Sequence, residues 1–127
     1  SPDALRVFLV EDSPLLREVL GDSIAELDGV TLAGEADGEE AALAGLQGKG
    51  ADVLIVDLEL RQGNGFGVLR RVQAEPERYG RPRTVVFSTY GHHAVRQRCE
   101  GLGAEAFFDK ALGLDGLLEF IQAAVNS

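Results

Sequence analysis

Side chains that can handle phosphate or a metal ion follow four of the apolar, strand-like runs of this 127-residue chain. Glu11 and Asp12 close the first run, Asp57 the third, Ser88 the fourth and Lys110 the fifth. In an open parallel sheet, ligands bind outside the carboxyl ends of the strands, where the strand order reverses. The sequence therefore predicts that three acids, a hydroxyl and an ammonium lie along one edge of a sheet and that the chemistry occurs there.

Three carboxylates at neighbouring strand ends favour metal and phosphoryl chemistry. Crowded carboxylates repel each other, so they either raise their pKa values or hold a divalent cation through oxygen ligands. Mg²⁺ suits such a site because it takes few carboxylates and keeps positions for water and phosphate. A carboxylate beside this ion can be a nucleophile toward a phosphoryl group, and Asp57 is our candidate. Lys110 and Ser88 would stabilise the transferred group.

The elements that must position these side chains alternate along the chain. Apolar, β-rich runs occupy 5–10, 30–33, 53–56, 84–87 and 106–108. Helical spacing of apolar residues fills the intervals and the segment 114–125, and a loop is expected through 76–82. The run 53–56 has no polar alternation, which is typical of a strand covered on both faces. We therefore expect an α/β fold with a five-stranded parallel sheet, doubly wound and flavodoxin-like, in the strand order 2-1-3-4-5 with five helices.

Length, charge and cysteine content bound the remaining possibilities. The chain is long enough for one domain, which we place at 1–127. Its net charge of −9 and pI near 4.6 are opposite to those of a nucleic-acid binder, and its apolar runs are shorter than a membrane span. A single cysteine and no leader indicate a cytoplasmic protein. Because the chain opens without methionine, we expect residues 1–4 to be disordered or an expression remnant.

Four segments combine into one specific motif: FLVEDSP at 8–14, VDLEL at 56–60, VVFSTYG at 85–91 and GAEAFFDK at 103–110. In order and spacing they resemble the receiver domain of a bacterial two-component response regulator, over essentially the whole chain. The resemblance implies a phosphoprotein that accepts a phosphoryl group from a sensor histidine kinase or histidine phosphotransfer protein. It implies these roles: Asp57 as acceptor; Glu11, Asp12, Asp57 and the backbone carbonyl of Glu59 as Mg²⁺ ligands; Lys110 as partner of the phosphoryl oxygens.

The resemblance also implies a conformational switch. Ser88 would move toward the phosphate, and the Phe107 ring would swing inward behind it. The segments 94–102, 106–108 and 114–125 would form the face that contacts a downstream effector protein or domain. Charged residues there could pair in a phosphorylation-linked homodimer, namely Arg96, Arg98, Asp115 and Glu119. Such a protein catalyses only its own phosphorylation and dephosphorylation and is otherwise not an enzyme.

Several residues depart from the family pattern and are expected to modulate the site. Arg61 and Ala111 stand where the family commonly has proline, so we expect looser loops and a trans peptide before Ala111. Thr89 replaces a smaller residue. Glu59 and Tyr90 flank the approach of water to an acyl phosphate, which leads to the hypothesis of an altered phosphate lifetime.

Plainer interpretations compete at single positions. Acids after a strand can cap a helix, Ser88 can be a turn residue, Lys110 a solvated lysine and Phe107 a packing residue. Glu39 and Glu40, in the first turn of a helix, are interpreted as a solvated face that favours the helix dipole. Two surface histidines and one cysteine are interpreted as having no chemistry: His92, His93 and Cys99.

Two other function classes share much of this motif. One is an interaction module on the same fold that works without phosphorylation, favoured if Arg61 and Ala111 disrupt the site. The other is an aspartyl-phosphate phosphatase, similar to haloacid-dehalogenase-like enzymes, which place Asp-x-Asp after the first strand. Here the candidate nucleophile follows the third strand, and Glu59 replaces the second acid.

Overall fold

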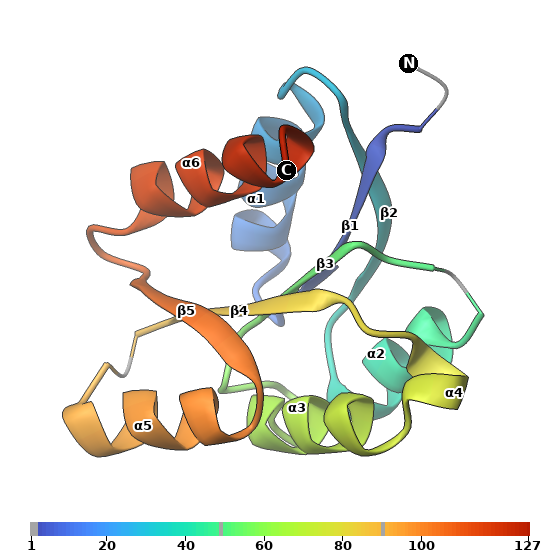
Figure 1. Cartoon of the computed structure of the whole chain (residues 1–127). Helices are drawn as coiled ribbons and strands as arrows, with labels where there is room; N and C mark the ends of the chain where they lie inside the picture. Colours follow the sequence, from blue (N-terminus) through green and yellow to red (C-terminus); the bar gives the residue numbers. More distant parts are fainter. Residues whose placement is uncertain (1–2, 49, 90) are drawn as a thin grey trace.

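Strands and helices alternate along the computed structural model, which describes residues 3–48, 50–89 and 91–127 (Figure 1). The strands are β1 (Leu5–Val10), β2 (Val30–Ala36), β3 (Val53–Val56), β4 (Arg83–Ser88) and β5 (Ala104–Asp109). The helices are α1 (Pro14–Ala25), α2 (Glu39–Leu46), α3 (Gly65–Ala74), α4 (Pro76–Tyr79), α5 (His93–Gly101) and α6 (Leu114–Val125).

The five strands form one parallel sheet in the order β2-β1-β3-β4-β5, so the predicted fold class is confirmed. Helices α1 and α6 cover one face of this sheet, and α2, α3 and α5 cover the other, with α4 beside α3 (Figure 1). The strand order reverses between β1 and β3. Their carboxyl ends therefore open at the edge where a doubly wound fold binds its ligands.

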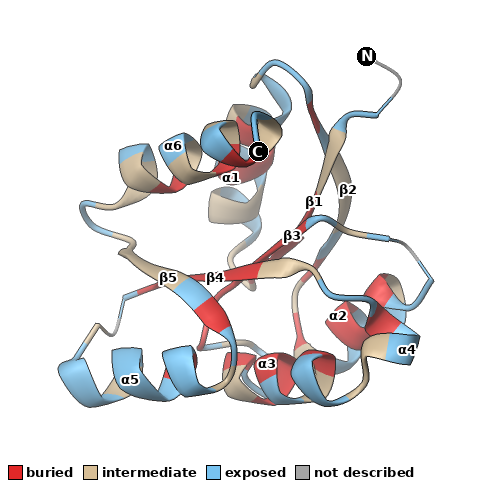
Figure 2. Cartoon of the chain, in the orientation of Figure 1, coloured by how far each residue is buried: buried red, intermediate tan, exposed pale blue. Residues whose placement is uncertain are grey.

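Two hydrophobic clusters lie on either side of the sheet. Within β1, Val7 and Leu9 face the cluster under α1 and α6, whereas Phe8 and Val10 face the cluster under α2, α3 and α5. All residues of β3 are buried (Figure 2), because helices cover both of its faces. The central strand that carries Asp57 at its end is thus held rigidly between two packed layers.

Two details of the sequence-based prediction were wrong. The described residues contain six helices instead of five, because 76–79 form the short helix α4 and not a plain loop. Pro76 suits the first turn of that helix, whereas four residues are too few to show a helical period. The strands β2 and β5 are also longer than 30–33 and 106–108. Both lie at the sheet edges, where polar residues interrupt the apolar run.

Candidate metal and phosphoryl site

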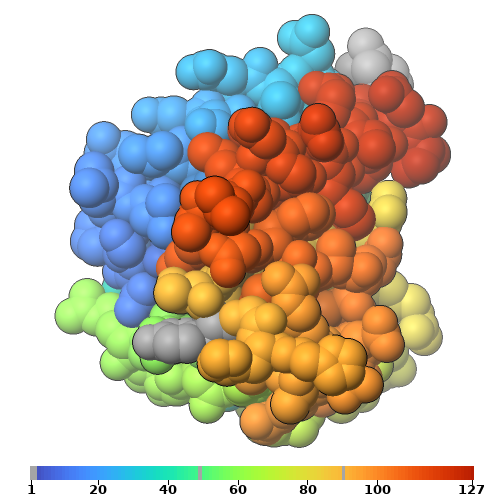
Figure 3. Space-filling model, turned by 90° about the vertical axis from the view of Figure 1, so that its left-hand side faces the viewer, coloured from blue at the N-terminus to red at the C-terminus, as the bar shows by residue number. Residues whose placement is uncertain are grey.

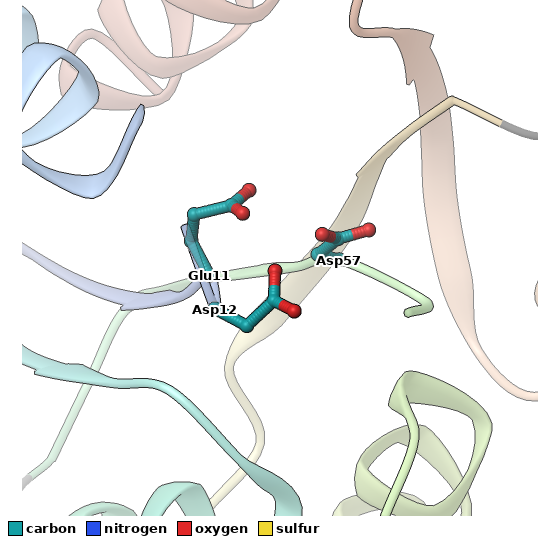
Figure 4. A group of neighbouring side chains, drawn as sticks. All are labelled: Glu11, Asp12 and Asp57. Carbon is teal, nitrogen blue, oxygen red and sulfur yellow. The ribbon is translucent and has the colours of Figure 1, made fainter. Parts of the chain in front are cut away.

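Three carboxylates meet where β1 and β3 end (Figure 4). Glu11 is 1% exposed and Asp57 is 3% exposed, while Asp12 is half-buried. One oxygen of each carboxylate lies within 4.8 Å of an oxygen of the others. Parallel pairing of β1 with β3 explains this convergence, because the backbone N–H of Asp57 donates to the carbonyl of Val10 at 3.0 Å. The structure therefore brings together the acids that the sequence placed at separate strand ends.

The donor set of this cluster fits a hard divalent cation. It offers only carboxylate oxygens, and Mg²⁺ binds one or two carboxylates and completes its shell with water and phosphate. Glu59 lies beside the cluster, since its backbone N–H donates to Oδ1 of Asp57 at 3.3 Å. The side chain of Glu59 is exposed.

Lys110 supplies the positive charge of the site. Its Nζ lies 2.6 Å from Oδ2 of Asp57 and 3.0 Å from Oε1 of Glu11. Burial alone would lower the pKa of Lys110, yet hydrogen bonds to both carboxylates raise it above its usual value. Burial raises the pKa of Glu11, against the lowering effects of the Ser13 N–H and of Lys110. The lysine is thus a permanent cation between two buried acids.

The turn that holds Lys110 is fixed without proline. The backbone N–H of Lys110 donates to the carbonyl of Ser88 at 3.1 Å, which extends the pairing of β4 with β5. Asp109 accepts the N–H of Ala111 through Oδ1 at 2.7 Å and the N–H of Gly113 through its carbonyl at 2.6 Å. The peptide before Ala111 is trans, as expected. Hydrogen bonds that Asp109 accepts supply the constraint that a proline would give.

The loop after Asp57 is likewise tied down, by residues of α2. The N–H of Glu39 donates to the carbonyl of Gln62 at 2.9 Å, and the N–H of Glu40 donates to the Gln62 side chain at 2.9 Å. In return, the Glu39 carboxylate accepts the N–H of Asn64 at 3.0 Å. Glu39 lies in the first turn of α2, as interpreted from the sequence, and its carboxylate also holds the loop. Arg61 is exposed and lies 3.4 Å from Asp37.

Ser88 and Phe107 lie on neighbouring strands beside the acids. Ser88 is fully buried at the end of β4, and its Oγ finds no hydrogen-bond partner among the described residues. Phe107 is half-buried on β5 and packs against the cluster under α5. A buried hydroxyl without a partner is costly, so an acceptor brought close to Ser88 would be favoured.

The other candidate residues lie apart from the cluster or outside the described part. Thr89 follows β4 and is exposed, whereas Tyr90 lies outside the described residues, so its modulating role stays a sequence-based hypothesis. His92 and His93 are exposed at the start of α5. Cys99 is buried, and burial raises the pKa of its thiol, which fits a structural residue.

Arg17 was missed by the sequence analysis. From α1 its Nη1 donates to the carbonyl of Glu11 at 2.7 Å, and its Nε lies 3.4 Å from the Glu35 carboxylate. It thereby fixes the backbone that joins the two neighbouring acids. Only its position six residues after Glu11, one turn into a helix, could have indicated this contact.

The doubly wound parallel sheet, with three acids and a lysine at its switch point, places the chain among the α/β domains that bind ligands at the carboxyl ends of their strands. Within that class, the chain belongs to the response regulator receiver domain family, whose model matches residues 7–122. The resemblance seen in the sequence is therefore confirmed.

Comparisons with individual relatives support the same family assignment. The protein-glutamate methylesterase/protein-glutamine glutaminase 2 of Dechloromonas aromatica is 28% identical over 98% of this chain and 33% of its own length. The protein-glutamate methylesterase/protein-glutamine glutaminase of Treponema pallidum is 34% identical over 86% of this chain and 27% of its own length. The crystal structure of the response regulator domain of Thermotoga maritima CheB matches with a TM-score of 0.85 and 25% identity over 98% of both chains. The chain thus spans about a third or less of these curated relatives.

Proposed function

We propose that this chain, as a single domain over 1–127, is a phosphorylation-controlled receiver whose acceptor is Asp57. The observation that supports this best is the placement of the Asp57 carboxylate. It is buried at the end of the central strand, 2.6 Å from the Lys110 ammonium and within the group of three acids. A nucleophilic carboxylate needs both a cation for the phosphoryl oxygens and a metal site beside it.

In the proposed reaction an Asp57 oxygen attacks the phosphorus of a phosphohistidine on a kinase or phosphotransfer protein. A carboxylate O–P bond forms, the donor N–P bond breaks, and its electron pair and a proton stay with the histidine. Glu11, Asp12, Asp57 and the carbonyl of Glu59 would hold Mg²⁺, which supplies charge neutralisation for the phosphoryl oxygens. Lys110, whose Nζ lies 2.6 Å from Oδ2 of Asp57, would pair with the same oxygens. Water later cleaves the acyl phosphate and releases inorganic phosphate.

The switch would pass from Asp57 to the face formed by α5, β5 and α6. The buried Ser88 hydroxyl has no hydrogen-bond partner within the described part of the chain, and Phe107 lies on the adjacent strand. A phosphoryl group that binds Ser88 in one arrangement better than in another shifts the population toward the first. The changed face would contact a downstream effector protein or domain, or a second copy of this chain. We propose a cytoplasmic location; among the described helices none is long and apolar enough to cross a membrane.

The two competing functions have weaker support. A module that works without phosphorylation was favoured if Arg61 and Ala111 disrupted the site, yet hydrogen bonds to the carboxylates of Glu39 and Asp109 hold both loops. Among aspartyl-phosphate phosphatases, the haloacid-dehalogenase-like enzymes place both acids after the first strand, whereas Asp57 follows β3.

The test is intact-protein mass after incubation with Mg²⁺ and acetyl phosphate, for the wild type and for Asp57→Asn. We expect one added phosphoryl group in the wild type and none in the variant, with circular dichroism showing both proteins folded. Addition of a phosphoryl group to both proteins would show that the acceptor is a residue other than Asp57. Addition to neither would support the interaction module, and steady release of inorganic phosphate from simple phosphate esters would support the phosphatase.

A further inference from the structure

Arg96, on α5, joins three parts of the molecule beside the proposed switch. Its Nε donates to the carbonyl of Gly91 at 2.9 Å, and its Nη1 donates to the carbonyl of Phe107 at 3.4 Å. Its guanidinium carbon also lies 4.4 Å from the centre of the Phe107 ring, within the range of a cation–π interaction. One planar group therefore holds the backbone before α5, the backbone of β5 and the aromatic ring.

The fit around this guanidinium is close. A Cβ added at Gly91 would lie 3.1 Å from Nη2 of Arg96 and 3.3 Å from Cε1 of Phe107. Helix α5 and strand β5 lie side by side on one face of the molecule (Figure 3). Because Gly91 has no side chain, the arginine can reach across to the ring and the two carbonyls at once.

These contacts lie close in sequence to Ser88, whose buried hydroxyl would gain a hydrogen bond if an acceptor came within reach. Ser88 ends β4 three positions before Gly91, and Val86 of the same strand pairs with Phe107. The Ser88 hydroxyl has no partner in the described part of the chain, so an acceptor on Asp57 would favour any arrangement that reaches it. A contact that is stronger in the present arrangement than in the other one would oppose that change.

We propose that Arg96 is a positioning residue that holds Phe107 and the Gly91 backbone in the arrangement of the unmodified protein and thereby restrains phosphoryl uptake at Asp57. This inference rests on the proposed receiver function. The inference adds to the proposed function a restraint by Arg96, which lies outside the acidic cluster. When the restraint is removed, the ring and the backbone are free to adopt the arrangement in which Ser88 meets the phosphoryl group.

The same helix offers a matched control. Arg98 lies two positions further along α5, is exposed, and places its guanidinium carbon 3.9 Å from the centre of the Phe66 ring. Phe66 belongs to α3 and packs against the cluster on that face. Arg98→Gln therefore removes one charge and one cation–π contact from α5, as Arg96→Gln does, but leaves Gly91 and Phe107 untouched.

The experiment measures the rate of adduct formation with acetyl phosphate and Mg²⁺ by intact-protein mass, in the full chain. We expect Arg96→Gln to react about two- to tenfold faster than the wild type, since a cation–π contact and exposed hydrogen bonds are lost. Arg98→Gln should react at the wild-type rate. Arg96→Lys keeps a charge near the ring but loses the forked donors, so its rate should lie between those of the wild type and Arg96→Gln. Thermal unfolding of each protein identifies any effect on stability.

Each outcome decides the matter. An unchanged or slower rate in folded Arg96→Gln would overturn the inference, because a purely structural arginine lowers the unfolding temperature without accelerating uptake. Equal acceleration by Arg98→Gln would also overturn it, because the effect would then be one of surface charge. If the wild type forms an adduct and all variants match it, only this inference fails. If no protein forms an adduct, the proposed function fails and this inference with it.

Discussion

The Nζ of Lys110 contacts Oδ2 of Asp57 at 2.6 Å, and 19% of the lysine side chain is exposed against 4% of the aspartate side chain. A divalent cation held by the three acids would draw on the same Asp57 carboxylate. If the proposed function holds, lysine and metal would compete for this carboxylate as long as no phosphoryl group is present. In the proposed reaction, both cations would bind the phosphoryl oxygens once that group is attached to Asp57.

This competition predicts that Lys110→Ala binds Mg²⁺ more tightly, by about tenfold, because the metal no longer displaces a charge-assisted hydrogen bond. Without metal, the variant should lose about 1–3 kcal/mol of stability, since the buried carboxylates of Glu11 and Asp57 lose the hydrogen bonds that the ammonium donates. Calorimetric titration with Mg²⁺ and urea unfolding measure the two effects. Arg70→Gln, which removes an exposed cation from α3, is the control. Weaker Mg²⁺ binding by Lys110→Ala would contradict the competition.

Glu39 and Gly67 fit against each other at the loop after Asp57. A Cβ at Gly67 would collide with the Glu39 carboxylate, which accepts the Asn64 N–H at 3.0 Å. We expect Gly67→Ala to destabilise the protein by about 1 kcal/mol, because the carboxylate must leave that hydrogen bond. In a Glu39→Ala background, Gly67→Ala should stabilise the protein by about 0.5–1 kcal/mol, since alanine has a higher helix propensity than glycine. Urea unfolding of the wild type, the two single variants and the double variant completes a double-mutant cycle. Additive changes in the free energy of unfolding would refute the contact between Glu39 and Gly67.

The sequence was sufficient for the sheet order and for the position of the acids. Periodicity locates buried strands such as 53–56, and the residue after each strand then falls at a known edge. It was insufficient for Glu39 and Arg96, whose partners lie many positions away on other elements. Such contacts depend on how side chains pack after the elements have docked, and no spacing pattern encodes them. A four-residue helix such as α4 shows no period either.

Arg83 and Glu105 pair across the amino-terminal ends of β4 and β5 at 3.0 Å. The hydrogen bond from Arg83 lowers the pKa of Glu105 below the ordinary value of 4.5. An acid whose pKa is lower in the folded protein than in the unfolded chain stabilises the fold. This stabilisation is complete when the pH is above the pKa of the unfolded chain, and it is lost as the pH falls through the pKa of the folded protein. Because both side chains are 41% exposed, the contribution is only about 0.5 kcal/mol.

The matching measurement is urea unfolding of the wild type and of Glu105→Gln at about pH 7 and about pH 3. The wild type should be the more stable protein at the higher pH, and the difference should vanish at the lower pH. A difference that stays constant between the two conditions would show that the ion pair does not account for it.

Glu59 is the exposed side chain closest in sequence to the proposed acceptor, and its own N–H already donates to Oδ1 of Asp57 at 3.3 Å. Its carboxylate can accept a hydrogen bond from a water that approaches an acyl phosphate on Asp57. Loss of one such bond is worth about 1 kcal/mol, so Glu59→Ala should lengthen the phosphate lifetime by about three- to tenfold. Phosphoryl loss is followed by intact mass after the donor is removed. Glu77→Ala, on α4, serves as the matched control. A lifetime equal to that of the wild type would remove Glu59 from the dephosphorylation step, whereas a shorter one would mean that its charge repels the attacking water or shields the phosphoryl group.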